Sequence, residues 1–198
     1  MEHEERIRAA WGAREMRAAA TETLEVYGGE IFSFLLSRLR TVSDAQEAFS
    51  MFTEDLWNGL PAFGWRCSMR TWAYTLARHA AARYATAPRL RAAKAAEPEL
   101  AALIEKARSS TNLYQQTDVK DRFRALRAQL DDEGKLLLVL RVDRGMSWRD
   151  LALTMSGDVE LDEPAIARES ARLRKAFERV KSELKAMAER EGLIKSEK

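Results

Sequence analysis

The sequence is poor in the residues that catalytic and metal sites most often use. Its 198 residues include two histidines, His3 and His79, and one cysteine, Cys67. A single cysteine excludes an intramolecular disulfide, and none of these three residues is spaced from another like a pair of metal ligands. A glycine-rich phosphate loop is also missing. We therefore expect no catalytic residue, no metal and no cofactor, and we predict that the protein is not an enzyme.

Long hydrophobic runs are missing as well. No segment approaches the roughly eighteen apolar residues that a membrane-spanning helix needs, and the charged residues 1–6 do not resemble a signal peptide. An apolar content of 46% is nevertheless enough for a packed core. The scarcity of cysteine fits a reducing compartment. These features predict a cytoplasmic protein with no membrane contact of its own.

Alternating, strand-like segments are absent, and the apolar residues repeat with helical spacing. We therefore predict an all-α fold. The glycine pair within residues 27–30 predicts a break after a first helix of about twenty residues. Candidate N-caps of later helices are Ser43 or Asp44, Ser68 and Ser147. The helices that we expect after the break cover residues 31–39, 44–58, 69–84, 119–130, 132–140, 148–153 and 165–187.

The order of these segments predicts two small helical domains. Residues 109–118 are polar and lack periodicity, and Pro88 and Pro98 flank an Ala- and Arg-rich stretch before them. We place the first domain at residues 1–90, the linker at residues 91–118 and the second domain at residues 119–192.

Charge is strongly segregated, although the formal net charge is only +2. Residues 44–58 contain four acidic residues and no basic one, and residues 61–94 contain seven basic residues and no acidic one. A second basic segment, residues 166–185, has seven basic and three acidic residues. Acidic surface suits a basic protein patch and basic surface suits phosphates. The sequence thus predicts two kinds of partner.

Aromatic residues lie among the arginines of the first basic segment. Bases of single-stranded DNA stack on such rings while cations neutralise the backbone. Trp72 falls on the apolar side of its helix, which favours core packing, whereas Trp65 lies in the expected loop. The aromatic residues of this segment are Phe63, Trp65, Trp72, Tyr74 and Tyr84.

The predicted second domain contains a helix-turn-helix pattern. Ser147 and Asp150 form a capping box, and the helix that starts near Ala165 has the length to enter a major groove. Its apolar seam leaves Arg168, Arg172, Lys175 and Arg179 on the outer side, with Glu169 and Arg174 near the edges. A solvated charged face would look the same, so this pattern alone favours DNA binding and a plain surface about equally.

Two stretches resemble extracytoplasmic-function sigma factors of the sigma-70 family. The acidic DAQE (44–47) leading to LWNGLPAF (56–63), followed by SMRTWAYTLARH (68–79), is similar to sigma region 2. LDDE (130–133) and GMSWRDLA (145–152) are similar to region 4. The resemblance covers residues 22–87 and 119–185. The sequence departs from the usual pattern at residues 49–53, at Ala73, at His79 and in a longer turn at residues 156–164.

This resemblance implies a transcription initiation factor that binds the β′ and β subunits of core RNA polymerase and promoter DNA, both duplex and melted. It also implies an anti-sigma factor as a partner. The implied polymerase-binding residues are Asp44, Glu47, Glu54, Asp55 and Trp57. The implied minus-ten residues are Gly64, Trp65, Arg66, Ser68, Arg70, Trp72, Tyr74, Arg78 and Arg83. The implied minus-thirty-five residues are Arg149, Arg168, Glu169, Arg172, Arg174 and Lys175.

Two other hypotheses remain open from the sequence. A stand-alone helix-turn-helix regulator would bind duplex DNA without polymerase. The other hypothesis is a helical interaction protein, suggested by the altered residues 49–53. Such a protein would not bind DNA with the steep salt dependence that several phosphate contacts produce.

Overall fold

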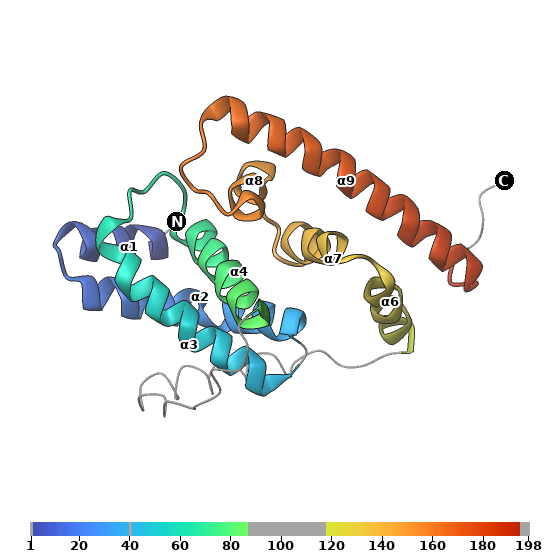
Figure 1. Ribbon diagram of the computed structural model, residues 1–198, viewed down its shortest axis with the longest axis horizontal. Helices are drawn as coiled ribbons and strands as arrows, with labels where there is room; N and C mark the ends of the chain where they lie inside the picture. The colour runs from blue at the N-terminus through green and yellow to red at the C-terminus, as the bar shows by residue number, and fades with distance from the viewer. Residues whose placement is uncertain (1, 40, 87–117, 195–198) are drawn as a thin grey trace. The chain divides into compact units, whose positions relative to one another are not determined.

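The computed structural model describes residues 2–39, 41–86 and 118–194, and every element in these ranges is helical (Figure 1). The predicted all-α class is therefore confirmed. The chain divides into two compact units. One contains Met1–Leu113 with Gly157–Glu160, and the other contains Tyr114–Ser156 with Leu161–Lys198. The predicted linker, except for Asp118, lies outside the described residues.

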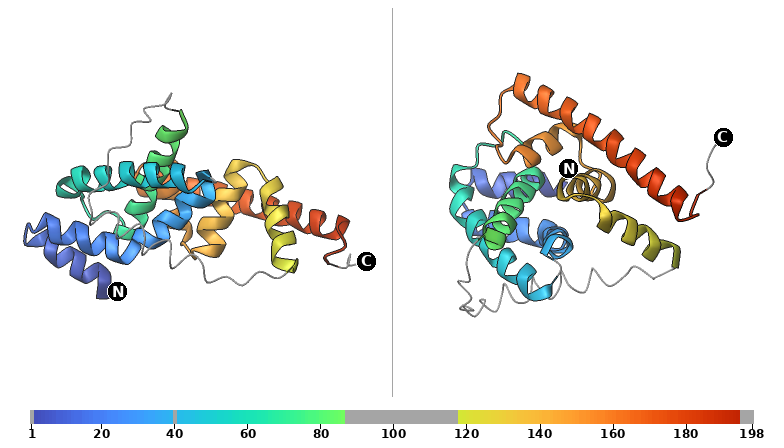
Figure 2. Two further views of the ribbon diagram at one scale, coloured as in Figure 1. Left: turned by 90° about the horizontal axis from the view of Figure 1, so that it is seen from below. Right: turned by 45° about the vertical axis from the view of Figure 1, so that its right-hand side comes forward.

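The described residues of the first unit form a bundle of four α-helices. They are α1 (Glu2–Gly12), α2 (Met16–Leu39), α3 (Val42–Gly59) and α4 (Met69–Thr86), with a short 3₁₀ turn η1 (Leu60–Ala62) after α3. Helix α1 folds back beside α2, and α2, α3 and α4 pack against one another (Figure 2). Aromatic rings fill the core: Phe32 meets Phe49 edge to face, and Phe34 meets Tyr74 in the same way.

The break near the start of the chain lies earlier than we predicted. Helix α1 ends at Gly12, and Arg14 adopts a left-handed backbone conformation with φ of 61° before α2 starts. One continuous helix over the first twenty residues is therefore wrong. The reversal lets α1 pack along α2 with Ile7 fully buried.

The predicted break at residues 27–30 is also wrong, because α2 runs through both glycines. Glycine is unfavourable inside a helix for reasons of backbone entropy, so another interaction must favour it here. Gly28 is buried, and a Cβ built on it would lie 3.6 Å from the ring of Phe49. Packing of α2 against α3 thus overrides the local preference of the sequence.

The N-cap of α3 is Thr41 rather than Ser43 or Asp44. The Thr41 hydroxyl accepts a hydrogen bond from the Asp44 backbone N–H at 3.1 Å and donates to the Asp44 carboxylate at 2.6 Å. The predicted cap of α4 is confirmed, since Ser68 Oγ accepts from the Thr71 backbone N–H at 3.0 Å.

Glu4 connects α1 to α2 and α4. Its carboxylate accepts hydrogen bonds from the backbone N–H groups of Met69 and Arg70, at 3.0 and 3.1 Å, and from the Tyr27 hydroxyl at 2.8 Å. The first N–H groups of a helix have no partner within that helix, so Glu4 supplies acceptors to the start of α4. Burial, together with the hydrogen bond and charge of Glu4, raises the pKa of Tyr27 above its ordinary value, which keeps the hydroxyl protonated as a donor.

The second unit is built on one long helix. Its elements are α6 (Asp118–Gln129), α7 (Asp132–Leu138), a π-helical turn η2 (Val139–Asp143), α8 (Trp148–Ser156) and α9 (Glu163–Arg190). Helices α6, α7 and α8 all contact α9 (Figure 1). Leu126, Leu130, Leu138, Val180 and Met187 form a core cluster between them.

The predicted starts of α7, α8 and α9 are confirmed by their caps. Asp131 Oδ1 accepts from the Gly134 N–H at 2.7 Å, and Asp162 Oδ1 accepts from the Ala165 N–H at 2.7 Å. Ser147 and Asp150 form the expected capping box. Such caps depend on nearby residues alone, which explains why the sequence reveals them.

Among the described residues, no helix combines the length and apolar content that crossing a membrane requires. The same residues contain no group of three or more His, Cys, Asp or Glu side chains placed to hold a metal ion.

We expect Glu4→Ala to lower the free energy of unfolding by about 2 kcal/mol, because two helix N–H groups and a phenol lose a charged acceptor. Urea denaturation followed by circular dichroism measures this change. The matched control is Glu5→Ala, an exposed acid in the first turn of the same helix. Equal stability of the two variants would contradict the role of Glu4.

Substitution by alanine should have opposite effects on stability at two buried glycines. Gly28→Ala should stabilise the protein by up to about 1 kcal/mol, since a methyl group fits beside Phe49 and alanine favours helix. Gly134→Ala should destabilise it, because the new Cβ would lie 2.9 Å from Asp131 Oδ1 and 3.1 Å from Val180 Cγ2. Calorimetric unfolding of both variants tests this, and a destabilised Gly28→Ala would disprove the packing argument.

Candidate functional site

Helix α3 displays its acidic residues in two directions. Asp44 accepts hydrogen bonds from Thr41 and from the Tyr84 hydroxyl of α4, and Asp55 forms an ion pair with Arg83 of α4. These two carboxylates face the neighbouring helix and hold α3 against α4. They are therefore engaged inside the first unit.

The remaining residues predicted to bind polymerase lie on the outer side of α3. Glu54 is exposed, Glu47 is half-buried, and the side chain of Trp57 is among the exposed large apolar groups, with 51% of its surface accessible. Helical spacing places Glu47 and Glu54 two turns apart on one stripe, with Trp57 at its edge. An exposed tryptophan beside two carboxylates is a surface suited to a partner protein that is basic and partly apolar. We call Glu47, Glu54 and Trp57 the α3 stripe.

The loop between η1 and α4, residues 63–68, is held by aromatic stacking. Phe63 is 5% exposed and stacks on Trp72 at 4.5 Å between ring centroids, with 17° between the planes. Trp72 is itself only 7% exposed. The assignment of Trp72 to DNA contact is therefore corrected: its ring is part of the core that supports the loop. Gly64, Arg66 and Ser68 are exposed on this loop, and the Arg66 guanidinium lies 4.0 Å from the carboxylate of Glu160.

Trp65 adopts a strained conformation at the centre of the loop. Its φ of 53° lies in the left-handed region, which costs a bulky residue on the order of 1–3 kcal/mol. The ring contacts Phe63 at 5.0 Å and Trp11 of α1 at 6.1 Å, and the Arg8 guanidinium lies over it at 5.4 Å. Its indole N–H is buried with no hydrogen-bond partner in the described structure, which costs roughly another 1–3 kcal/mol.

Two further residues assigned to melted DNA are engaged within the bundle. Tyr74 is fully buried and its hydroxyl donates to Glu30 at 2.7 Å. Arg70 donates to the same carboxylate through Nε at 3.0 Å and through a second nitrogen. Burial opposes the charged form of Arg70, but the hydrogen bonds and charge of Glu30 outweigh it and raise the pKa of Arg70. The assignment of Tyr74 to DNA is wrong, and the charge of Arg70 is compensated by Glu30.

Arg83 and Arg78 differ in their surroundings. Arg83 pairs with Asp55, so a residue assigned to DNA and one assigned to polymerase bind each other. Burial, aided by the charge of Arg38, lowers the pKa of Arg78 from its ordinary value. Burial and the charges of Arg78 and Arg83 likewise lower the pKa of His79, while Asp55 acts in the opposite direction. The exposed surface of α4 is thus less available to a phosphate backbone than its arginine count predicts.

In the second unit, α8 is fixed on α9 around Trp148. Ser170 Oγ donates to the Trp148 carbonyl at 3.1 Å, and the Trp148 ring meets Phe177 edge to face at 5.7 Å. The guanidinium groups of Arg141 and Arg174 lie over the same ring. Arg174, which we assigned to DNA, therefore stacks on Trp148.

Most charged residues near the start of α9 are paired. Arg149 donates two hydrogen bonds to Glu163, at 2.6 and 2.7 Å. Arg172 donates to Glu133 at 2.7 Å and to both oxygens of Glu169, at 2.7 and 2.9 Å. Hydrogen bonds with these two carboxylates raise the pKa of Arg172. Of the predicted minus-thirty-five residues, Arg149, Glu169 and Arg172 thus neutralise charge within the unit.

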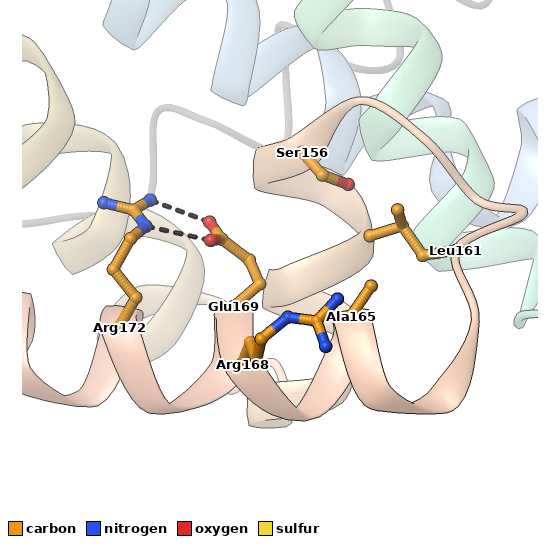
Figure 3. Close-up of a pocket in the computed structure, with 6 residues that line it drawn as sticks. All are labelled: Ser156, Leu161, Ala165, Arg168, Glu169 and Arg172. Carbon is orange, nitrogen blue, oxygen red and sulfur yellow. Dashed lines mark hydrogen bonds and ion pairs between the residues drawn. The ribbon is translucent and has the colours of Figure 1, made fainter.

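A shallow pocket of about 480 Å³ lies along the first turns of α9 (Figure 3). Leu161 and Ala165 give it an apolar wall, and Arg168 lies at its edge. In Figure 3, Arg172 points to Glu169, whereas the Arg168 guanidinium extends toward Ala165. Arg168 and Lys175 are exposed. An apolar wall beside a guanidinium complements a base-pair edge in the major groove, where a methyl group can lie next to hydrogen-bond acceptors.

The sequence did not reveal four residues that organise these surfaces. Glu4 and Glu30 bind α4 from distant segments, and Arg8 and Trp11 cover Trp65. Trp11 also donates from its indole N–H to the Leu60 carbonyl at 2.8 Å. The sequence carries one signal for them: Ile7 and Trp11 lie four residues apart, a spacing that places both on one side of a helix.

Comparison of the chain with protein-family models, with curated proteins and with solved structures found no match.

Proposed function

We propose that this protein is a transcription initiation factor of the sigma type that acts on core RNA polymerase and promoter DNA and has no catalytic activity of its own. The observation that carries the proposal is the order α3, loop, α4 in the first unit. It presents the acidic α3 stripe with an exposed tryptophan, followed directly by a loop that holds Trp65 and Arg66. A regulator that binds duplex DNA alone has no need for either surface.

The second unit supports the duplex-binding part of the proposal. Helices α8 and α9 form the pair expected of a helix-turn-helix, and α9 has its first turns exposed beside the pocket at Leu161 and Ala165. Base edges are read near the start of such a helix, and phosphates are bound further along it. On this proposal, Arg168 would contact base edges, and Lys175 and Arg179, which are exposed two to three turns later, would contact phosphates.

The test of this function is reconstitution. The purified chain is mixed with core RNA polymerase and supercoiled genomic DNA, and transcripts are mapped. Discrete start sites that depend on the chain are the expected result. Duplex binding without polymerase binding would favour a stand-alone regulator, and binding to neither would favour a helical interaction protein.

Two arginines of α9 should differ in their effect on duplex recognition. Arg168→Ala should relax the preference for one base pair by about 5- to 150-fold, the discrimination that a bidentate arginine–guanine contact supplies. Arg172→Ala should change selectivity less, because two carboxylates already bind its guanidinium. Selection from randomised duplexes with both variants measures this, and a larger loss for Arg172→Ala would reverse the assignment.

The α3 stripe should bind core polymerase. We expect Glu54→Lys combined with Trp57→Ala to weaken binding at least tenfold, since both a charge and an apolar contact are lost at an interface. Fluorescence anisotropy with labelled chain and core enzyme measures the affinity. The control is Glu25→Lys, the same charge change at an exposed position of α2. Equal affinities of the two variants would exclude α3 as the docking helix.

A further inference from the structure

The loop at residues 63–68 is attached to α1 at both ends and at its centre. Before the loop, Trp11 donates to the Leu60 carbonyl; after it, Glu4 accepts from the Met69 and Arg70 N–H groups. At the centre, Trp11 and Arg8 contact the ring of Trp65. Helix α1 therefore supports the loop at three points, together with the stacking of Phe63 on Trp72.

The conformation of Trp65 that α1 helps to hold is unfavourable for that residue itself. The backbone is left-handed, and the indole N–H is buried without an acceptor among the described residues. Such features persist only where surrounding contacts hold them, and they gather where a conformational change is part of function. The contacts that hold Trp65 come from Phe63 within the loop and from Trp11 and Arg8 of α1.

The α1 contacts on Trp65 are of the kind that a nucleobase would replace. Arg8 is exposed and lies over the indole ring as a cation, and Trp11 presents a ring to it nearly at a right angle. Stacking of an unpaired base on an aromatic ring is stronger than an exposed cation–ring contact. A base can therefore displace Arg8, which leaves the guanidinium next to the strand's phosphates.

We infer that α1 holds Trp65 in a resting state and that an unpaired base of single-stranded DNA takes the place of Arg8 and Trp11 on its ring. This inference rests on the proposed function, since it names how α1 regulates the same loop. Helix α1 then competes with the strand. Binding relieves the strain of Trp65 and opens its N–H to an acceptor on the base or on water.

The decisive experiment measures the affinity of the full chain for a fluorescein-labelled single-stranded oligothymidine at constant ionic strength. Removing a cation ordinarily weakens DNA binding. Arg8→Ala should instead strengthen it by about two- to fivefold, because the competing cation–ring contact is lost. The matched control is Arg14→Ala, just beyond α1. It removes the same charge from a residue with no ring contact in the described chain. This control should bind the oligonucleotide as tightly as the wild-type chain or more weakly.

Trp65→Phe provides a second, independent readout. It keeps an aromatic ring and removes the unpartnered N–H, so we expect the midpoint of urea unfolding to stay the same or rise while the affinity for the oligonucleotide falls about threefold or more. A tryptophan with only a structural role would give the opposite pattern, with lower stability and unchanged binding.

The outcomes separate this inference from the proposed function. If Arg8→Ala binds the oligonucleotide more weakly than the wild-type chain, and as weakly as Arg14→Ala does, competition by α1 is overturned. It is also overturned if the wild-type chain binds no single-stranded DNA, either alone or on core polymerase. Chain-dependent transcription in those cases would leave the proposed function intact. Conversely, tighter binding by Arg8→Ala without any affinity for polymerase supports the inference and overturns the sigma assignment.

Discussion

The carboxylate of Glu4 is the contact on which the first unit depends. It lies on an eleven-residue helix that is too short to be stable alone, yet it supplies acceptors to the start of α4 and to Tyr27 of α2. One side chain thus fixes the position of α1, the first turn of α4 and the end of the loop between η1 and α4. The indole N–H of Trp11, bound to the Leu60 carbonyl, fixes the other end of this loop.

Internal ion pairs decide which charged residues remain for a partner. Arg70 is bound by Glu30, Arg83 by Asp55, and Arg172 by Glu133 and Glu169. Because a guanidinium in two-point contact with a carboxylate must give up those bonds to bind a phosphate, charge counts overstate the basic surface. Among the described residues, the exposed groups that remain include Glu54 and Trp57 of the α3 stripe and Arg168, Lys175 and Arg179 on α9, whereas Arg66 lies 4.0 Å from Glu160.

The features that the sequence predicted well are local ones. The caps at Ser68 and Ser147 and the seam of α9 depend on residues a few positions apart, and all of them are present. The errors concern contacts between distant segments. Gly28 continues a helix because Phe49 packs beside it, and Tyr74 is buried because Glu30 lies opposite its hydroxyl. The sequence does not reveal whether an aromatic residue among arginines faces solvent or the core. The DNA-binding surface predicted from the sequence therefore includes residues that are buried.

The internal ion pairs of Arg70, Arg83 and Arg172 affect how the proposed factor would act. Affinity for DNA rises with the number of phosphates that are neutralised, so these pairs would lower the affinity of each unit by itself for DNA. Two weak sites on one chain still bind tightly when a common scaffold engages both, because the second contact becomes intramolecular. Under the proposed function, core polymerase bound at the α3 stripe is that scaffold. Selective promoter binding would then arise in the complex rather than in the free chain, which agrees with a loop whose tryptophan is covered by α1 until a strand is presented to it.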